Sequence, residues 1–314
     1  MKRSSYPIFV HLTDSHRASA LLLVLTTIAI LSLEILGVVQ TTQFNVENHL
    51  LFAKRDQARR LAESGVAFVL HPLVDAEDPL LEQKINSMES FKVTLVSEGA
   101  RLNINSILAQ NDLPLLTHLF TSWDLSLEES QSLVDAIADW VDADNVRRLN
   151  GAESDDYDAA GLSSKPKNRS FQSVGEMETV MGIGILEKKR PDWREAFTVW
   201  SEGPLDLNEA SAELISIAAE VGLPQAESLV QYRTIVDPND RTKMKKQKLV
   251  SLDQAAQIMG ISPDQFTKVS RRLTVNSQTF RIKSTGIVDH FTHTIEAVVR
   301  RNIQPVVYLL WSES

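Results

Sequence analysis

The chain has 314 residues, 43% of them hydrophobic and 23% charged, a composition that excludes a disordered or fibrous protein. The formal net charge of -9 argues against a dedicated nucleic-acid-binding protein, because binding to phosphates needs a basic surface. The chain has no cysteine, which excludes disulfide bonds, thiolate metal sites and cysteine nucleophiles.

The first element predicted along the chain is a transmembrane helix over the apolar run 19–39. At about 1.5 Å of rise per residue, this run crosses a hydrocarbon core roughly 30 Å thick. Basic residues precede it, opposed only by Asp14, so the positive-inside bias places residues 1–18 in the cytoplasm. Glu34 lies within the run and is costly in lipid; it either reaches the outer headgroups or faces another helix in an assembly.

Beyond the span, apolar residues recur at spacings of three, four and seven, which predicts that the same helix continues as a stalk. His71-Pro72 is the predicted end of this helix. The apolar positions are Phe44, Leu51, Ala58, Ala62, Val66 and Val69.

Strands are predicted at three places. Residues 91–104 alternate around Ser97-Glu98-Gly99, which indicates a hairpin. Residues 197–207 and 279–311 have a similar character, and the latter are rich in β-branched and aromatic side chains. Helical stretches separate these strands, so the pattern predicts an α+β protein. The helical stretches cover residues 106–196 and 208–273.

The two helical stretches resemble diverged copies of one module. Leu102-Asn103-Ile104-Asn105-Ser106 matches Leu205-Asp206-Leu207-Asn208-Glu209, each a strand end followed by an Asn suited to N-capping a helix. Further on, 173–183 matches 251–261, each ending in Met-Gly-Ile. The first copy is longer, and its extra residues follow Asp139-Trp140-Val141-Asp142.

The insertion in the first copy is acidic. Eight carboxylates lie between Asp135 and Asp158, and only Arg147 and Arg148 oppose them. Like charges at helical spacing repel unless something neutralises them. Two interpretations remain: a solvated acidic loop, or a calcium site, since Ca²⁺ takes six to eight oxygen ligands in flexible geometry. The flanking Trp140 favours an ordered segment, because an indole is unusual in a solvated tail.

Signatures of catalysis are missing from the sequence. It contains no phosphate-binding loop, no zinc-protease motif and no serine-hydrolase elbow. The sequence therefore predicts a protein that is not an enzyme.

Several short motifs occur together in the order and spacing of one known family. The chain resembles the K-type minor pseudopilin of type II secretion systems, the general secretion pathway protein K family. The matching segments are Arg17-Ala18-Ser19-Ala20-Leu21-Leu22, Ala62-Glu63-Ser64-Gly65-Val66, Asp139-Trp140-Val141-Asp142-Ala143-Asp144, Gly151-Ala152-Glu153, Pro166-Lys167-Asn168-Arg169, Ser173-Val174 and Glu296-Ala297-Val298-Val299-Arg300-Arg301.

The resemblance implies a pilin-like fold with a long N-terminal transmembrane helix, a small antiparallel sheet and a large inserted helical domain. We expect that domain to consist of two related modules of the SAM or helix-hairpin-helix type. The expected boundaries are 1–18 for a cytoplasmic leader, 19–39 for the transmembrane helix, 40–75 for the stalk, 76–104 with 197–207 and 274–314 for the sheet, 105–196 for the first module and 208–273 for the second.

The resemblance also implies processing and assembly. A prepilin peptidase is expected to cut between Ala18 and Ser19, where family members usually have Gly before the cut. The fifth mature residue is then Leu23, in place of the Glu that most pilin-like subunits use to pair with the subunit above. Leu23 suits a subunit with nothing above it, and Glu34 remains a candidate assembly residue. The implied partners are the I-type and J-type pseudopilins and the inner-membrane assembly platform.

The family's calcium sites lie in the acidic region, so the resemblance implies calcium as a bound ion here. The candidate ligands carried over by position are Asp139, Asp142, Asp144, Glu153, Asp155 and Asp156.

The main hypothesis is thus a structural tip subunit of a periplasmic pseudopilus, anchored once in the bacterial inner membrane and needed for export of folded proteins. A minor pilin of a type IV pilus has the same physical features. A third hypothesis is a helix-hairpin-helix nucleic-acid-binding module of a DNA-uptake system, because Leu205–Ser211 resembles the start of such domains. The net charge opposes it, and Pro224 lacks the N–H that a phosphate-binding turn would supply.

Overall fold

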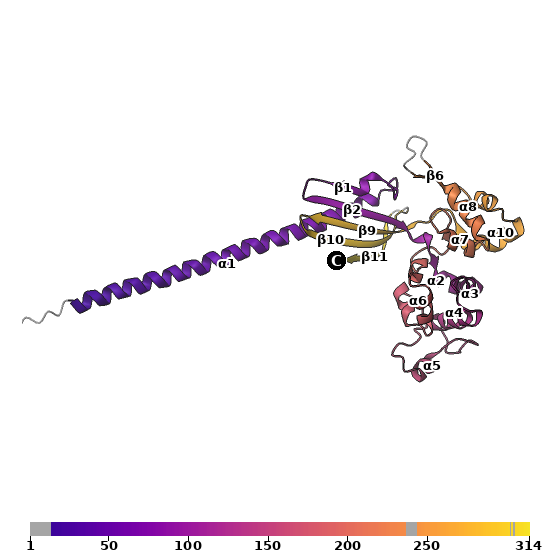
Figure 1. Ribbon diagram of the computed structural model, residues 1–314, viewed down its shortest axis with the longest axis horizontal. Coiled ribbons are helices and arrows are strands. Elements are labelled where there is room, and N and C mark those ends of the chain that lie inside the picture. Colours follow the sequence, from indigo (N-terminus) through magenta and orange to yellow (C-terminus); the bar gives the residue numbers. More distant parts are fainter. Residues whose placement is uncertain (1–13, 237–243, 302, 304) are drawn as a thin grey trace, which may run out of the picture.

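The computed structural model describes residues 14–236, 244–301, 303 and 305–314. Figure 1 shows three parts in a row: a long helix, a small sheet packed against its C-terminal part, and a helical lobe beyond the sheet. Most of the leader expected at 1–18 lies outside the described residues. The α+β architecture predicted from the sequence is confirmed.

Helix α1, Asp14–Val69, is continuous and roughly 84 Å long at 1.5 Å per residue. Among the described residues, one helix is long and apolar enough to cross a membrane, and it is this one. Hydroxyl groups within the span are satisfied internally: Thr27 Oγ1 donates to the Leu23 carbonyl oxygen at 2.6 Å, and Ser32 Oγ to that of Ile28 at 2.7 Å. The helix ends at Val69, close to the predicted His71-Pro72.

The sheet is antiparallel with the order β1-β2-β9-β10-β11. The alternating burial of β2 directs one row of side chains toward α1, as a half-buried strand requires. The apolar stripe of α1 packs on this row and closes a core of its own, separate from that of the lobe. The strands are β1 (Glu82–Lys84), β2 (Glu89–Ser97), β9 (Thr279–Val288), β10 (Phe291–Arg300) and β11 (Val307–Glu313).

Helix α1 and strand β9 meet backbone to backbone. A Cβ atom on Gly286 would overlap the Ala58 carbonyl oxygen and lie 2.7 Å from the Ala62 nitrogen. Beside it, Ser284 Oγ donates to the Ala62 carbonyl oxygen at 2.7 Å. The approach is possible only because the facing residues are small, which is why the stalk stripe contains alanines where larger apolar residues are common in helices.

The helical lobe has one continuous core that runs from Leu102 to Leu273. Its helices are α2 (Ile104–Ala109), α3 (Leu113–Ser122), α4 (Leu127–Val141), α5 (Ser154–Ala159), α6 (Ile183–Lys189), α7 (Ala212–Ala218), α8 (Leu223–Arg233), α9 (Leu252–Met259) and α10 (Pro263–Val269), with a β6–β7 hairpin (Thr234–Val236, Met244–Lys246) after α8.

The two halves of the lobe are closed in the same way. In the first half, β3 (Leu102–Asn103) pairs in parallel with β4 (Phe197–Thr198). In the second half, β5 (Leu205–Asp206) pairs in parallel with β8 (Leu273–Thr274). Each module therefore begins and ends at one short parallel pair.

The matched asparagines of the two modules make matched hydrogen bonds. Asn105 Nδ2 donates to the Phe171 carbonyl oxygen at 2.8 Å, and Asn105 Oδ1 accepts from the Phe171 nitrogen at 2.9 Å. Asn208 makes the same two bonds with Leu249, at 3.2 and 2.7 Å. The expectation that these two asparagines are N-caps was wrong, because Asn103 caps α2. Asn105 instead holds Phe171, two residues before Ser173, which caps the short helix Val174–Thr179.

Two strand predictions were also wrong. Residues 91–104 do not form a hairpin, because β2 ends at Ser97 and a short turn, Glu98–Ala100, carries the chain into the lobe. Residues 197–207 do not join the five-stranded sheet, because their strands pair with β3 and β8 at the base of the modules. Strands of two residues close a module and are too short to extend a sheet.

A buried carboxylate connects the sheet to the lobe. Glu98 is fully buried after β2. It accepts from Arg281 Nε of β9 at 2.6 Å and from the hydroxyl group of Thr198 in β4. Because a buried carboxylate without partners is costly, these contacts hold the first module against the end of the sheet.

We expect Gly286→Ala to destabilise the protein by about 3 kcal/mol, because the added methyl group overlaps the backbone of α1 and forces the helix off the sheet. The measurement is urea unfolding of the full chain in detergent micelles, followed by tryptophan fluorescence. Gly184→Ala is the matched control, since nothing lies within 4 Å of a Cβ atom there. Equal stabilities of the two variants would contradict the close approach.

Candidate metal centre

Helix α4 delivers the first acidic side chains of the insertion. It begins at a capping box in which Ser126 and Glu129 satisfy each other's backbone N–H groups. Its last turn carries Asp139, and Asp142 follows the helix in an extended conformation. The chain therefore turns away from the helix axis at Asp142, and the next acidic residues can return toward it.

Asp139 is fully buried and is paired with Arg148. The Arg148 guanidinium donates to Asp139 at 2.7 Å and also contacts Asp142, and the Arg148 backbone N–H donates to Asp139 at 3.2 Å. Burial raises the pKa of Asp139, while the hydrogen bonds from Arg148 oppose this shift. A Cβ atom on Gly151 would overlap the Asp139 carboxylate, so the loop can close over it only at a glycine.

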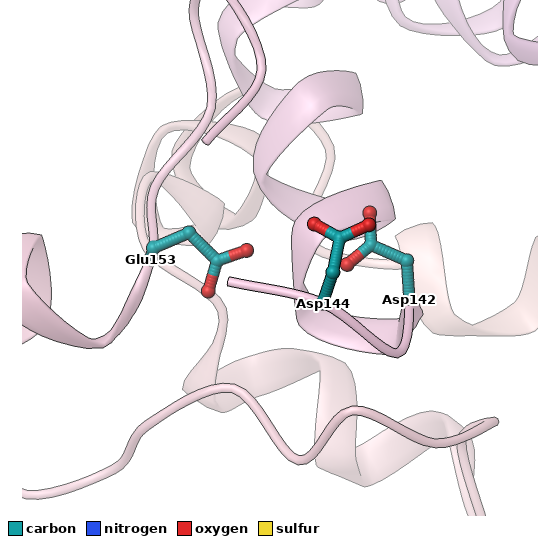
Figure 2. A group of neighbouring side chains, drawn as sticks. All are labelled: Asp142, Asp144 and Glu153. Atoms are coloured by element: carbon teal, nitrogen blue, oxygen red, sulfur yellow. The ribbon is translucent and has the colours of Figure 1, made fainter. Parts of the chain in front are cut away.

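Three carboxylates meet beside this pair. One oxygen of each of Asp142, Asp144 and Glu153 lies within 4.8 Å of the other two. Figure 2 shows Asp142 and Asp144 next to each other after α4. Glu153 points toward them from the facing segment of the loop, just before α5. The group thus joins the start of the insertion to the start of α5.

Glu153 has the least favourable surroundings of the three. Its residue exposure is 5%, and neither carboxylate oxygen has a hydrogen bond of normal geometry among the described residues. Oδ1 of Asp142 is likewise buried without a partner. Burial raises the pKa of Glu153, and the negative charges of Asp139, Asp142 and Asp144 raise it further. The nearby Ser154 backbone N–H only opposes this rise of the pKa. Buried carboxylates are normally paired or bound to a metal.

The other acidic residues predicted as ligands are engaged elsewhere or exposed. Asp156 accepts from the Glu153 backbone N–H at 2.9 Å and pairs with Arg147 at 2.9 Å. Asp155 is exposed on α5, and Asp139 is held by Arg148. The structure therefore brings together three of the six predicted residues.

Asn168 positions the loop, and the sequence did not predict this role. Asn168 Nδ2 donates to the Asp144 carbonyl oxygen and to Asn145 Oδ1, both at 3.1 Å. The only available signal was its place in the motif Pro166–Arg169. The role of Arg148 as the counterion of Asp139 was also not predicted from the sequence. The available signal was that Arg147 and Arg148 are the only basic residues in the acidic segment.

Two aromatic residues lie at the ends of the loop, Trp140 in α4 and Tyr157 in α5. Trp140 and Tyr157 are both fully buried, with ring centroids 5.7 Å apart. The Tyr157 hydroxyl accepts from the Met181 backbone N–H at 2.8 Å, and burial raises the pKa of Tyr157 to about 12. The two ends of the acidic segment, at Trp140 and Tyr157, are therefore buried, whereas residues 143–147 between them are exposed.

The three carboxylates suit a hard divalent cation. Oxygen ligands select calcium or magnesium over zinc and copper, and the group contains no nitrogen or sulfur donor. Calcium tolerates irregular geometry, whereas magnesium demands a near-ideal octahedron. The unpaired Glu153 and Asp142 oxygens are the atoms that such an ion would satisfy, so the residues present fit calcium.

The processing and assembly residues lie on α1, far from this group. The Ala18–Ser19 peptide bond falls within the helix near its start. Leu23 is 67% exposed, and Glu34 lies on an exposed part of the apolar span. None of the described contacts tests the roles assigned to them.

A membrane-length N-terminal helix that continues onto a small antiparallel sheet, with a helical lobe inserted between its strands, defines a pilin-like subunit. Residues 100–187 match the family model described as type II secretion system (T2SS), protein K. The resemblance to protein K predicted from the sequence is confirmed by this match together with its relatives.

Two relatives bear the name type II secretion system protein K. That of Pseudomonas aeruginosa is 26% identical over 165 residues, covering 49% of this chain and 48% of the relative. That of Pectobacterium carotovorum subsp. carotovorum is 26% identical over 200 residues, covering 62% and 57%. The chain thus spans about half the length of the curated relatives that it matches.

A solved structure has the same fold. A chain from the crystal structure of the GspK-GspI-GspJ complex of the enterotoxigenic Escherichia coli Type 2 Secretion System aligns with a TM-score of 0.60. The identity is 17%, and the alignment covers 88% of this chain and 99% of the solved one. At this identity the likeness concerns the fold.

The raised pKa of Glu153 predicts a pH dependence in the absence of metal. The native state binds the Glu153 proton more tightly than the unfolded state, where the pKa is near 4.5. The free energy of unfolding therefore falls as the pH rises from about 4.5 through the native pKa. We expect Glu153→Gln to be more stable than the unsubstituted chain at neutral pH in EDTA, by urea unfolding, with the gain lost at acidic pH.

Asp155→Asn is the matched control, because it removes an exposed carboxylate from the same segment. It should leave the pH dependence unchanged. If Glu153→Gln and the unsubstituted chain lose the same stability between pH 4.5 and neutral pH, the pKa of Glu153 is not raised in the native state.

Proposed function

We propose that this protein is a minor pseudopilin that forms the tip of the periplasmic pseudopilus of a type II secretion system. In this role it is a structural subunit, not an enzyme. It helps to start assembly of the pseudopilus and thereby supports export of folded proteins. The observation that carries the proposal is the bulk of the helical lobe at the end of the molecule opposite the membrane helix.

Pilin-like subunits stack with their long helices side by side, and each globular part leaves room for the next one above it. Here the lobe extends beyond the sheet and is broader than it, whereas α1 projects from the other side (Figure 1). A subunit of this shape can end a stack and cannot continue one. The apolar Leu23 is consistent with this position, because no incoming N-terminus above it needs a carboxylate.

The anchor fits the same role. The apolar part of α1 would hold the subunit in the inner membrane with its N-terminus in the cytoplasm and its lobe in the periplasm. A prepilin peptidase would cut between Ala18 and Ser19, and the assembly platform would then lift the helix out of the bilayer. Glu34 would turn toward a neighbouring helix in the assembly, since a lipid-facing carboxylate is costly.

The proposed partners are the I-type and J-type pseudopilins. The solved chain with the same fold comes from a GspK-GspI-GspJ complex, which supports partners of this kind. The family match over 100–187 favours type II secretion over a type IV pilus. It also weighs against a nucleic-acid-binding module.

We also propose that Asp142, Asp144 and Glu153 bind calcium. The ion would neutralise carboxylates that otherwise repel one another, and would fix the insertion against α4 and α5. Its contribution is structural, because ordering a long polar loop needs a source of free energy other than apolar burial.

We expect calcium to raise the melting temperature of the full chain, compared with EDTA, by about 5–10 °C when free calcium exceeds Kd about a hundredfold. Magnesium should give a smaller shift. Glu153→Gln should abolish the calcium shift, because it removes a buried ligand charge. Differential scanning fluorimetry in detergent micelles provides the measurement.

Asp155→Asn is the control for this experiment and should retain the shift. Loss of the shift in Asp155→Asn with retention in Glu153→Gln would contradict the assignment of the ligands. An unchanged melting temperature in all samples would contradict calcium binding.

We expect the full chain to co-purify with I-type and J-type pseudopilins as a ternary complex at micromolar concentration. Omitting each subunit in turn identifies the pairwise contacts. Mass photometry of the detergent complex measures the stoichiometry, which should be one copy of this chain per complex. Absence of a complex at micromolar concentration would refute the tip assignment.

A further inference from the structure

The two edges of the five-stranded sheet differ in their protection. Strand β1 is only three residues long, Glu82–Lys84, and two of these residues are charged. Strand β11 is seven residues long, and its only charged residue is Glu313. Natural sheets protect their edges with short strands, charges, prolines or bulges, and β1 is protected by its shortness and its charges. Strand β11 has one bulge, at Leu309, where its register with β10 shifts. From Leu310 to Glu313 its pairing with β10 is regular. Within β11 the sequence VYLLWSE has no proline and no lysine.

The outer side of β11 has unpaired backbone groups. Thr294 and Ser314 exchange both backbone hydrogen bonds, each at 2.9 Å. Because hydrogen-bonded and non-hydrogen-bonded pairs alternate along an antiparallel ladder, Trp311 and Glu313 direct their N–H and C=O groups away from β10. Among the residues that the structure describes, no other element pairs with this edge. Figure 1 shows β11 and the C-terminus at one margin of the sheet, with β1 at the other.

The side chains of β11 form an apolar ledge. Tyr308 is opposite Val299 and Trp311 opposite Ala297, so both aromatic residues lie on the face of the sheet that α1 covers. Val299 and Ala297 are buried in the core beneath α1, whereas Tyr308 is 48% and Trp311 41% exposed. Their rings pack edge to face with centroids 5.7 Å apart. The apolar core therefore extends past the helix to Tyr308 and Trp311. Among the described residues, none covers these two side chains fully.

The one charged residue of this edge is already paired. Glu313 pairs with Arg59 of α1 at 3.0 Å and with His293 at 3.2 Å, and it accepts from Trp311 Nε1 at 2.9 Å. The carboxylate thus serves to hold β11 against the helix and does not repel another strand. A long, apolar strand edge without free charge would aggregate unless a partner covered it.

We propose that β11 is the docking edge for an extended segment of a partner pseudopilin, which adds a strand to the sheet. Backbone donors and acceptors at alternate residues are complementary to another extended backbone, and a helix cannot satisfy them. The partner segment places an apolar side chain on the Tyr308–Trp311 ledge and pairs its backbone with Trp311 and Glu313. This inference rests on the proposed function, because the partner is a subunit of the same pseudopilus.

The first test is amide hydrogen exchange on the unsubstituted full chain in detergent, alone and with the I-type and J-type pseudopilins. We expect exchange at the amides of Trp311 and Glu313 to slow by at least about tenfold in the complex. The amide of Ile85, which donates to the Glu89 carbonyl oxygen beside β1, is the internal reference and should not change. Because this measurement uses no substitution, it does not depend on the folding of a variant.

The second test is substitution. Trp311→Lys should weaken the complex by about tenfold or more, since it removes an aromatic contact and charges the edge. Ile85→Lys is the matched control, because Ile85 is a 55% exposed apolar residue next to the opposite edge. It should leave the affinity unchanged.

The outcomes separate this inference from the proposed function. A ternary complex without protection at Trp311 and Glu313, and with unchanged affinity for Trp311→Lys, overturns the docking edge and leaves the tip assignment standing. Absence of any complex overturns both. Protection in the chain alone, accompanied by the mass of a dimer, assigns the edge to a second copy and overturns the partner proposed here.

Discussion

The direct contact between α1 and β9 is the constraint on which the rest of the molecule depends. Gly286 lets the strand backbone reach the carbonyl oxygen of Ala58, so at this point no side chain separates the helix from the sheet. Beyond this point the apolar side chains of α1 and the sheet pack together in one core. One continuous helix therefore connects the apolar N-terminal segment to the folded part.

The lobe depends on this arrangement in a second way. Its core is separate from the core under α1, and Glu98 joins the two parts through Arg281 and Thr198. The two modules add the bulk of the lobe without disturbing the sheet, because each module closes on its own parallel strand pair.

The insertion illustrates how charge and burial are balanced. Of eight acidic residues, some are paired with Arg147 or Arg148, and Asp142, Asp144 and Glu153 converge where a cation would neutralise them. In the five-stranded sheet, β11 presents the opposite situation, an apolar edge whose only charged residue is already paired. For the first place we propose an ion and for the second a partner.

Patterns that are local along the chain were readable from the sequence. They include the membrane span, the helical stalk, the acidic insertion and the repeat that matches Asn105 with Asn208, because each depends on composition or periodicity within one segment or on comparing two segments. Contacts between segments that are far apart in the chain could not be predicted from the sequence. Residues 197–207 alternate like sheet strands but pair with β3 and β8, and Asp139 has the spacing of a ligand but is held by Arg148. Only the tertiary structure decided which three carboxylates meet and which strand edge is left open, because both follow from how separate elements pack.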